Sequence, residues 1–143
     1  MSKYWIGVVG AKHAAFGMNR GFCAFSHGQE KAVSRLSPGD RFTYYSPREG
    51  YREGDVVQAF VALGTVLEGV PFEVDFNGSP GWVRPARTDI FARVPVRPLL
   101  ESLGFVSNPT HWGMAFRRSL FEISAPDFAL IDAAFANSGA SDG

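Results

Sequence analysis

Residues 36–47 read LSPGDRFTYYSP, and this short segment illustrates how the chain is built. The residues at 37–40 are typical of a turn, because proline fixes its own φ and glycine tolerates conformations that other residues avoid. The residues at 41–46 are rich in aromatic and β-branched side chains, which favour a strand. The segment therefore predicts a turn followed at once by a strand.

The same combination recurs along the chain. Strand-forming runs separated by glycine, proline and aspartate lie at residues 4–9, 41–46, 56–66, 72–76, 82–94 and 114–123. Short strands at this spacing are typical of a barrel or a sandwich. Helices are expected at 29–36, at 96–103, and after Ser124, which can cap a helix whose buried stripe is Phe128, Ile131 and Phe135. The pattern predicts an α+β domain, mostly β, with short helices.

Length and composition indicate one domain. The chain has 143 residues, which is long enough to bury a core, so we expect one domain over residues 1–137 and a flexible polar tail over residues 138–143. No apolar run approaches the ~20 residues of a membrane span, and the first residues read as a strand rather than a signal peptide. Cys23 is the single cysteine, which favours a reducing compartment. We expect a cytoplasmic protein that does not enter a membrane.

Charge is unevenly distributed although the formal net charge is zero. Residues 1–48 carry +5, residues 49–75 carry −5, residues 76–118 carry +4 and residues 119–143 carry −4. Such blocks can fold into one basic and one acidic face, or they can intermix on the surface. A basic face on a neutral protein would suit a polyanion held mainly by local contacts.

A search for catalytic residues is mostly negative. Cys23 and His27 are four residues apart, which would suit a thiolate nucleophile, but no orienting carboxylate is near them in the sequence. A free cysteine more often behaves as a small buried hydrophobe. Zinc-ligand spacings and glycine-rich phosphate loops are missing from the sequence. We therefore expect no catalytic residue, metal or cofactor, and keep a small hydrolase or transferase around Cys23 and His27 as an alternative.

Aromatic residues give a stronger indication. The chain has 13 Phe, 4 Tyr and 3 Trp, and Tyr45, Trp82 and Trp112 lie at predicted strand ends or in loops beside polar residues. A nucleobase needs flat apolar faces for stacking and a few donors and acceptors at its edge. Each of these aromatic side chains could instead pack in the core.

Several segments resemble the EVE domain of the PUA-like superfamily. The resemblance rests on YWIGVV at 4–9, Gly21-Phe22, Ser26-His27-Gly28, the segment at 36–47, QAFVALGTV at 58–66, and the ending from Leu103 through His111-Trp112-Gly113 to Phe128. It spans nearly the whole chain. It implies a twisted β-barrel with short flanking helices, related to PUA and YTH domains. Members of the superfamily bind RNA or modified nucleobases, the EVE type is associated with modified DNA bases, and YTH domains hold a methylated base in an aromatic cage.

By this analogy we expect a pocket between the end of the first strand, the loop at 21–27 and the strand end at 44–48. The hypothesis is a nucleic-acid-binding module, for DNA or RNA, that holds an extruded and modified base. The expected base-binding residues are Lys12, Phe22, His27, Tyr45, Ser46, Trp82 and Trp112, and the expected phosphate-binding residues are Arg20, Arg48, Arg84 and Arg117. The charged segment at 47–55 is either a solvated hairpin tip or a flap beside the pocket. A protein-interaction module without a nucleotide ligand is the third alternative.

Overall fold

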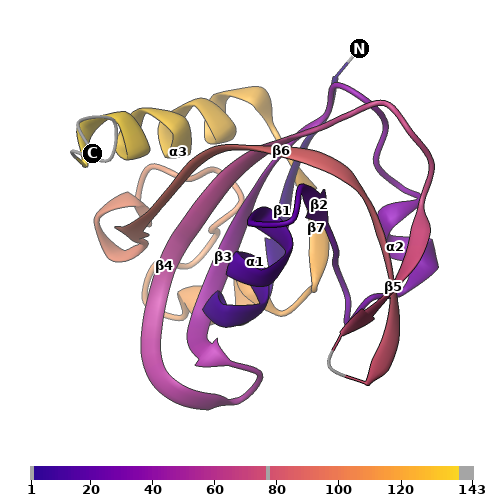
Figure 1. Ribbon diagram of the computed structural model, residues 1–143. Helices are drawn as coiled ribbons and strands as arrows, with labels where there is room; N and C mark the ends of the chain where they lie inside the picture. The colour runs from indigo at the N-terminus through magenta and orange to yellow at the C-terminus, as the bar shows by residue number, and fades with distance from the viewer. Residues whose placement is uncertain (1, 77, 139–143) are drawn as a thin grey trace.

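Seven strands form one curled, mixed sheet in the computed structural model, which describes residues 2–76 and 78–138 (Figure 1). The strands are β1 (Tyr4–Val8), β2 (Phe22–Cys23), β3 (Arg41–Gly50), β4 (Glu53–Val66), β5 (Phe72–Phe76), β6 (Ser79–Pro95) and β7 (Leu120–Ile123). Their order is β2-β6-β4-β3-β1-β7, with β5 paired to β6. β1 runs parallel to β3, whereas the other described pairs are antiparallel. The expected α+β domain, mostly β, is confirmed, with the barrel open as a half-barrel.

The curl of the sheet arises in its longest strands. The β3–β4 register shifts between Tyr44 and Tyr45, and the β4–β6 register shifts near Phe60. Such bulges bend a strand and increase its twist. Close packing inside the curl also requires Gly64, because a Cβ there would clash with the ring of Phe42. Bulges and a glycine together let the sheet wrap around its contents.

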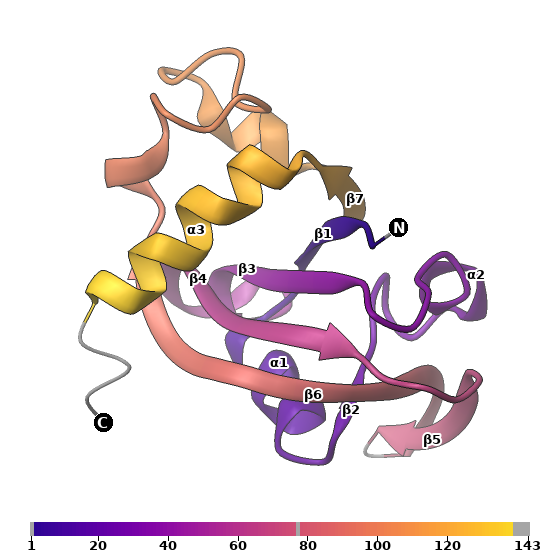
Figure 2. The ribbon, with the colours of Figure 1, turned by 90° about the horizontal axis from the view of Figure 1, so that it is seen from above.

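Both faces of the central strands are covered (Figure 2). Helix α1 (Ala11–Met18) lies on one face, where Phe42 and Tyr44 belong to the first core cluster. Helix α3 (Ala125–Asn137) lies on the other, and Tyr45 belongs to the second cluster. The two adjacent tyrosines thus point to opposite faces, as strand alternation predicts. Both are buried, because each face has its own covering layer.

The observed helices agree only in part with those predicted from the sequence. The cap at Ser124 is confirmed, since its Oγ accepts the N–H of Asp127 at 3.2 Å, and the predicted stripe of α3 is buried. The helix expected at 29–36 is reduced to α2 (Glu30–Val33), and that at 96–103 to turns around the 3-10 helix η1 (Arg97–Leu99).

Two other expectations need correction. The strand expected at 114–123 is wrong in its first part, because residues Trp112–Phe116 form the 3-10 helix η2 and pairing begins only at Leu120. The helix α1 and the short strand β2 were not predicted. A glycine on either side of the α1 segment and another inside it, at position 17, give it a weak helical signal.

Asp40 fastens the turn at 37–40 to the edge of β1. Its buried carboxylate accepts the backbone N–H of Lys3 at 2.9 Å, the indole N–H of Trp5 at 3.0 Å and the backbone N–H of Ser37 at 3.0 Å. A buried carboxylate with three donors is well compensated for its loss of water. This single side chain therefore orders the entry into β3.

Pairing of β3 and β4 continues almost to the end of their hairpin. Arg48 pairs with Val56 and Gly50 with Glu53, which leaves Tyr51 and Arg52 at the tip. The segment at 47–55 is thus mainly a strand hairpin.

No described helix is long and apolar enough to cross a membrane. The predicted tail at 138–143 lies, apart from Ser138, outside the described residues.

Candidate functional site

A cleft of about 470 Å³ opens where β1 ends and α1 begins, a volume in the usual range for ligand sites. The tip of the β3–β4 hairpin and the turn at 26–28 form its sides. The lining residues are Val8, Val9, Gly10, His13, Ser26, His27, Pro47, Arg48, Gly50, Tyr51, Arg52, Arg117 and Ser119. This is the place between the first strand, the 21–27 loop and the third strand where a pocket was expected.

The turn at 26–28 is an unusual piece of backbone. Ser26, His27 and Gly28 have φ values of 53°, 60° and 76°, all in the left-handed region. For a residue other than glycine this conformation costs about 1–2 kcal/mol, and such strain is concentrated at functional sites. A Cβ on Gly28 would also lie 2.9 Å from the Cα of Gly81.

Contacts on three sides hold this turn in place. The N–H of Gly28 donates to the carbonyl of Phe25 at 3.1 Å, and the N–H of Trp82 donates to the carbonyl of Gly28 at 2.8 Å. The hydroxyls of Ser26 and Ser119 are 2.5 Å apart and share a hydrogen bond. The side chain of His27 is therefore presented to solvent from a fixed backbone.

Two flat side chains meet at the mouth of the cleft. The rings of His27 and Tyr51 are 4.6 Å apart between centroids and nearly perpendicular, at 89°. Tyr51 is 62% exposed although it is aromatic. Because the rings form a corner, a flat heterocycle that stacks on one ring meets the other edge-on, and both arrangements are favourable for aromatic groups.

The cleft is electropositive. Three arginines, Arg48, Arg52 and Arg117, line it, and its described lining includes neither aspartate nor glutamate. The neighbouring acid, Glu49, is bound by Arg93 at 2.8 Å, which lowers the pKa of its carboxyl and satisfies its charge. The site therefore favours an anion or a group rich in acceptors.

The start of α1 adds to this character. Its N-cap residue, Gly10, lines the cleft, and no side chain caps the first turn. The first amides of a helix have no intrahelical partner and carry partial positive charge. A Cβ on Gly10 would lie 2.9 Å from the backbone carbonyl carbon of Gly50, so glycine allows the helix start to approach the end of β3.

His13, from the first turns of α1, supplies a neutral polar group. Burial, and to a lesser extent the nearby charge of His27, lower the pKa of His13 below its usual 6.5. Its imidazole is therefore uncharged at neutral pH and offers one donor and one acceptor. Its ring stacks on Phe76 at 5.1 Å, which fixes its orientation.

Three of the predicted residues, His27, Arg48 and Arg117, line the cleft. Lys12 is exposed on α1, next in sequence to the lining residue His13, but does not itself line the cleft. Arg20 is exposed at the far end of that helix, with its guanidinium 3.7 Å from the ring centroid of Phe16. Lys12 and Arg20 are thus near or outside the cleft rather than in it.

Tyr45 and Ser46 do not reach the cleft. Tyr45 is 2% exposed and stacks on Phe116 at 4.0 Å, so the expectation that its ring meets a base is wrong. Ser46 is 0% exposed, and its hydroxyl has no hydrogen-bond partner in the described part of the chain. Phe22 is buried as well, in a small cluster with Ala24 and Val83. Tyr45 and Ser46 are buried because the central strands are covered on both faces, whereas Phe22 is buried by the rings of Phe16, Phe72 and Phe76.

Arg84 is also in the interior, and its assignment to phosphate binding is wrong. Its guanidinium donates to the carbonyls of Val33 at 3.2 Å, Leu36 at 2.6 Å and Gly69 at 3.0 Å. These bonds tie α2 and the turn after β4 to β6. Arg84 is 5% exposed and its two Nη atoms already donate to three carbonyls, so a phosphate cannot reach it.

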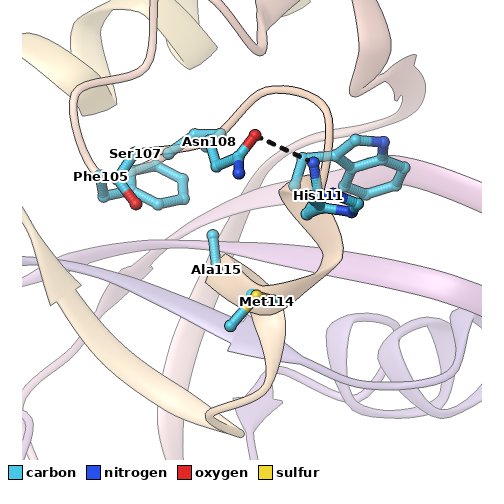
Figure 3. Close-up of a pocket in the computed structure, with 8 residues that line it drawn as sticks. Phe105, Ser107, Asn108, His111, Met114 and Ala115 are labelled. Carbon is cyan, nitrogen blue, oxygen red and sulfur yellow. Dashed lines mark hydrogen bonds between the residues drawn. The ribbon is translucent and has the colours of Figure 1, made fainter.

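The two predicted tryptophans lie apart from each other. Trp82 is half-buried against the first core cluster. Trp112 lines a second, smaller hollow of about 250 Å³ near η2 (Figure 3). Neither belongs to the lining of the main cleft. The aromatic partner of His27 is instead Tyr51, which sequence reasoning missed although an aromatic residue between charged residues at a hairpin tip is a usable signal.

Cys23 lies in the interior on β2. It is 0% exposed, and burial raises the pKa of its thiol to about 12, against a smaller opposing effect of Arg84. The thiol is thus neutral throughout the physiological range, whereas nucleophilic attack needs the thiolate. Among the described residues, no group of three His, Cys, Asp or Glu side chains is placed to hold a metal ion.

We expect Cys23 to be unreactive in the folded protein. At pH 8, a chromogenic disulfide reagent should label it at least about a hundred times more slowly in buffer than in 6 M guanidinium chloride, because burial removes both access and thiolate. Rapid labelling of the native protein would contradict the buried placement and would revive a nucleophilic role.

Comparisons with known proteins agree on the family and the fold. A family model described as the EVE domain matches residues 3–134. A UPF0310 protein of Mesorhizobium japonicum is 40% identical over 137 residues, covering 92% of this chain and 90% of that protein. A UPF0310 protein of Renibacterium salmoninarum is 35% identical over 131 residues, covering 92% and 94%.

A similar solved structure is the YTH domain of the Zygosaccharomyces rouxii MRB1 protein in complex with N6-methyladenosine RNA. The TM-score is 0.58 at 13% identity, with 92% of this chain and 83% of that chain covered. At this identity the likeness concerns the fold alone, and it confirms that the fold is similar to that of YTH domains.

Proposed function

This chain belongs to the EVE-domain family, and we propose that it is a nucleic-acid-binding module that holds one extruded, modified nucleobase in the cleft at His27 and Tyr51. The observation that carries the proposal is the corner made by these two rings within a cleft lined by three arginines. A nucleotide combines a flat heterocycle with an anionic phosphate, and both parts find a complement here.

The base is held by stacking and read at its edge. Stacking on an aromatic side chain contributes about 1–3 kcal/mol per base, which offsets the few kcal/mol needed to take a base out of a stack. The polar groups around the cleft are the neutral imidazole of His13, the paired hydroxyls of Ser26 and Ser119 and the uncapped amides at the start of α1. These donors and acceptors distinguish one base edge from another.

The phosphates are held by Arg48, Arg52 and Arg117, which line the same cleft. Phosphate contacts position a nucleic acid, whereas base contacts select it. Few arginines and a net charge of zero suit a ligand recognised mainly by its base, with a modest dependence on salt.

A modified base is favoured by two considerations of different kinds. The YTH domain that resembles this fold is in complex with N6-methyladenosine RNA. The volume of the cleft, about 470 Å³, also leaves room for a substituent on the ring. Burial of Cys23 and the concave shape of the site support binding over catalysis by that thiol and over a flat protein-interaction surface.

The direct experiment is a titration panel at low salt. Short single-stranded DNA and RNA oligonucleotides should contain one unmodified base, one 5-methylcytosine or one N6-methyladenosine, and binding should be followed by fluorescence anisotropy. We expect at least tenfold preference for one modified form over its unmodified parent. Absence of binding to every member of the panel would refute the proposed function.

Two adjacent arginines allow a matched test of the phosphate contacts. Arg117 lines the cleft, whereas Arg118 does not line it and places its guanidinium 4.5 Å from the ring centroid of Phe121. Arg117→Ala should weaken binding by several-fold for modified and unmodified oligonucleotides alike, and should lower the slope of log K against log salt by about one. Arg118→Ala removes the same charge and should change binding by less than twofold. Equal effects of the two substitutions would argue against a phosphate at Arg117.

A further inference from the structure

The second hollow, of about 250 Å³, has the features of a site for another base. It lies between the loop at 105–108 and η2, and its lining includes Phe105, Asn108, His111, Trp112, Met114 and Ala115. Figure 3 shows Phe105 on one side of this space and His111 on the other, with Ala115 and Met114 below. Flat side chains thus bound a small space from two sides.

One buried residue contacts two of the aromatic walls of the hollow, Phe105 and Trp112. The ring of Phe116 makes edge contacts with Phe105 at 5.7 Å and with Trp112 at 6.1 Å. Phe116 itself is buried and stacked on Tyr45. The walls are therefore positioned by the core and do not depend on a ligand for their orientation, which lowers the entropy lost on binding.

The side-chain amide of Asn108 offers a hydrogen-bond donor to the hollow. The side-chain oxygen of Asn108 accepts the backbone N–H groups of Thr110 and His111 at 3.0 and 3.3 Å. This fixes the orientation of its amide, and the amide nitrogen points toward the space between Phe105 and His111 (Figure 3). That nitrogen has no hydrogen-bond partner within residues 2–76 and 78–138. A donor between two aromatic walls suits the acceptor-rich edge of a nucleobase.

The charge around the hollow is compatible with a polyanion. The guanidinium of Arg97 lies 5.5 Å from the ring centroid of Trp112, one of the lining residues. Met114 at the rim is 61% exposed, although such an apolar side chain would normally be partly covered. An exposed methionine and a tryptophan beside an arginine form an adaptable surface for stacking.

The helix η2 connects the hollow to the main cleft. Met114 and Ala115 line the hollow, and Arg117 and Ser119, immediately after the helix, line the cleft. Two bases held in separate pockets cannot keep the spacing of about 3.4 Å that stacked neighbours have along a strand, so a strand that fills both sites is unstacked between them.

We infer that the hollow at Phe105, Asn108 and Trp112 holds a second base of the same strand, one or two nucleotides from the base in the cleft. This inference rests on the proposed function. It makes the ligand a single-stranded or locally melted oligonucleotide, with Arg117 between the two sites. A free nucleotide uses the cleft alone.

The test compares two ligands that carry the same modified base. One is its 5′-monophosphate, and the other is a pentanucleotide with that base at the centre. Wild-type protein should bind the pentanucleotide at least about tenfold more tightly. Trp112→Ala should lower affinity for the pentanucleotide by about tenfold, as expected for the loss of one stacked base, and should leave affinity for the monophosphate unchanged.

A second variant covers the case in which Trp112→Ala fails to fold. Met114→Glu places a negative charge at the exposed rim, and should reduce pentanucleotide affinity by about tenfold without changing that of the monophosphate. Val70→Glu, in the exposed turn after β4, adds the same charge elsewhere and serves as the control, with less than a twofold effect expected.

The outcomes separate this inference from the function on which it rests. Equal affinity of wild-type protein for both ligands, or a pentanucleotide affinity that Met114→Glu lowers no more than Val70→Glu, overturns the second site and leaves the cleft in place. Absence of binding to both ligands overturns the second site together with the proposed function.

Discussion

Replacing Tyr51 with alanine is expected to lower the affinity for the preferred modified nucleotide by about 10- to 100-fold, because stacking on one aromatic ring contributes about 1–3 kcal/mol. The ring is 62% exposed at the tip of the β3–β4 hairpin, so little core packing is lost. Stability should therefore change by less than about 0.5 kcal/mol. Titration of the variant with the preferred oligonucleotide, together with its thermal midpoint, measures both quantities.

Two matched variants accompany this test. Tyr51→Phe keeps the ring and should retain most of the affinity. Phe91→Ala removes another exposed aromatic side chain, 49% exposed on β6 and outside the cleft lining, and should leave binding unchanged. If Tyr51→Ala binds as tightly as the wild type, the corner between His27 and Tyr51 is not where the base is held.

Asp40→Ala is expected to destabilise the fold by about 3–5 kcal/mol. The substitution removes the acceptor of three N–H groups, including the indole N–H of Trp5, which is itself buried. Hydrogen bonds to a charged group contribute about 1.5–3 kcal/mol each, and a buried donor left without a partner carries a further cost. These contributions are not additive, so the total is less than their sum.

Urea unfolding measures this effect. The midpoint of the transition should fall while the slope stays constant, because the surface exposed on unfolding is similar. Asp55→Ala, which removes an exposed carboxylate from β4, should change the free energy of unfolding by less than about 0.5 kcal/mol. A loss of under 1 kcal/mol for Asp40→Ala would mean that the turn at 37–40 is not anchored to β1 through this carboxylate.

Many of the turns and helix starts can be predicted from the sequence because local side-chain chemistry determines them. Turn-forming residues at 37–40 precede β3 at Arg41, and Ser124 begins α3, each in the place that its chemistry predicts. The curl of the sheet is harder to predict from the sequence. It depends on bulges in β3 and β4 and on the close approach of Phe42 to Gly64, and neither leaves a distinct pattern in composition or periodicity.

The sequence indicated the position of the cleft better than the identity of the residues that line it. His27, Arg48 and Arg117 come from the turn after β2, the last part of β3 and the segment before β7, and all three line the cleft. Tyr45 does not, because alternation along a strand says which face a side chain takes but not whether that face is covered by another layer. Arg84 shows the same limit, since only the fold reveals the three carbonyls that it serves.

The most direct test of the central claim is the position of the base in a complex with the preferred modified oligonucleotide. Intermolecular nuclear Overhauser effects from the protons of the modified base should reach the ring protons of both His27 and Tyr51. Contacts of that base to other surfaces, with the resonances of His27 and Tyr51 unchanged at saturation, would contradict the account.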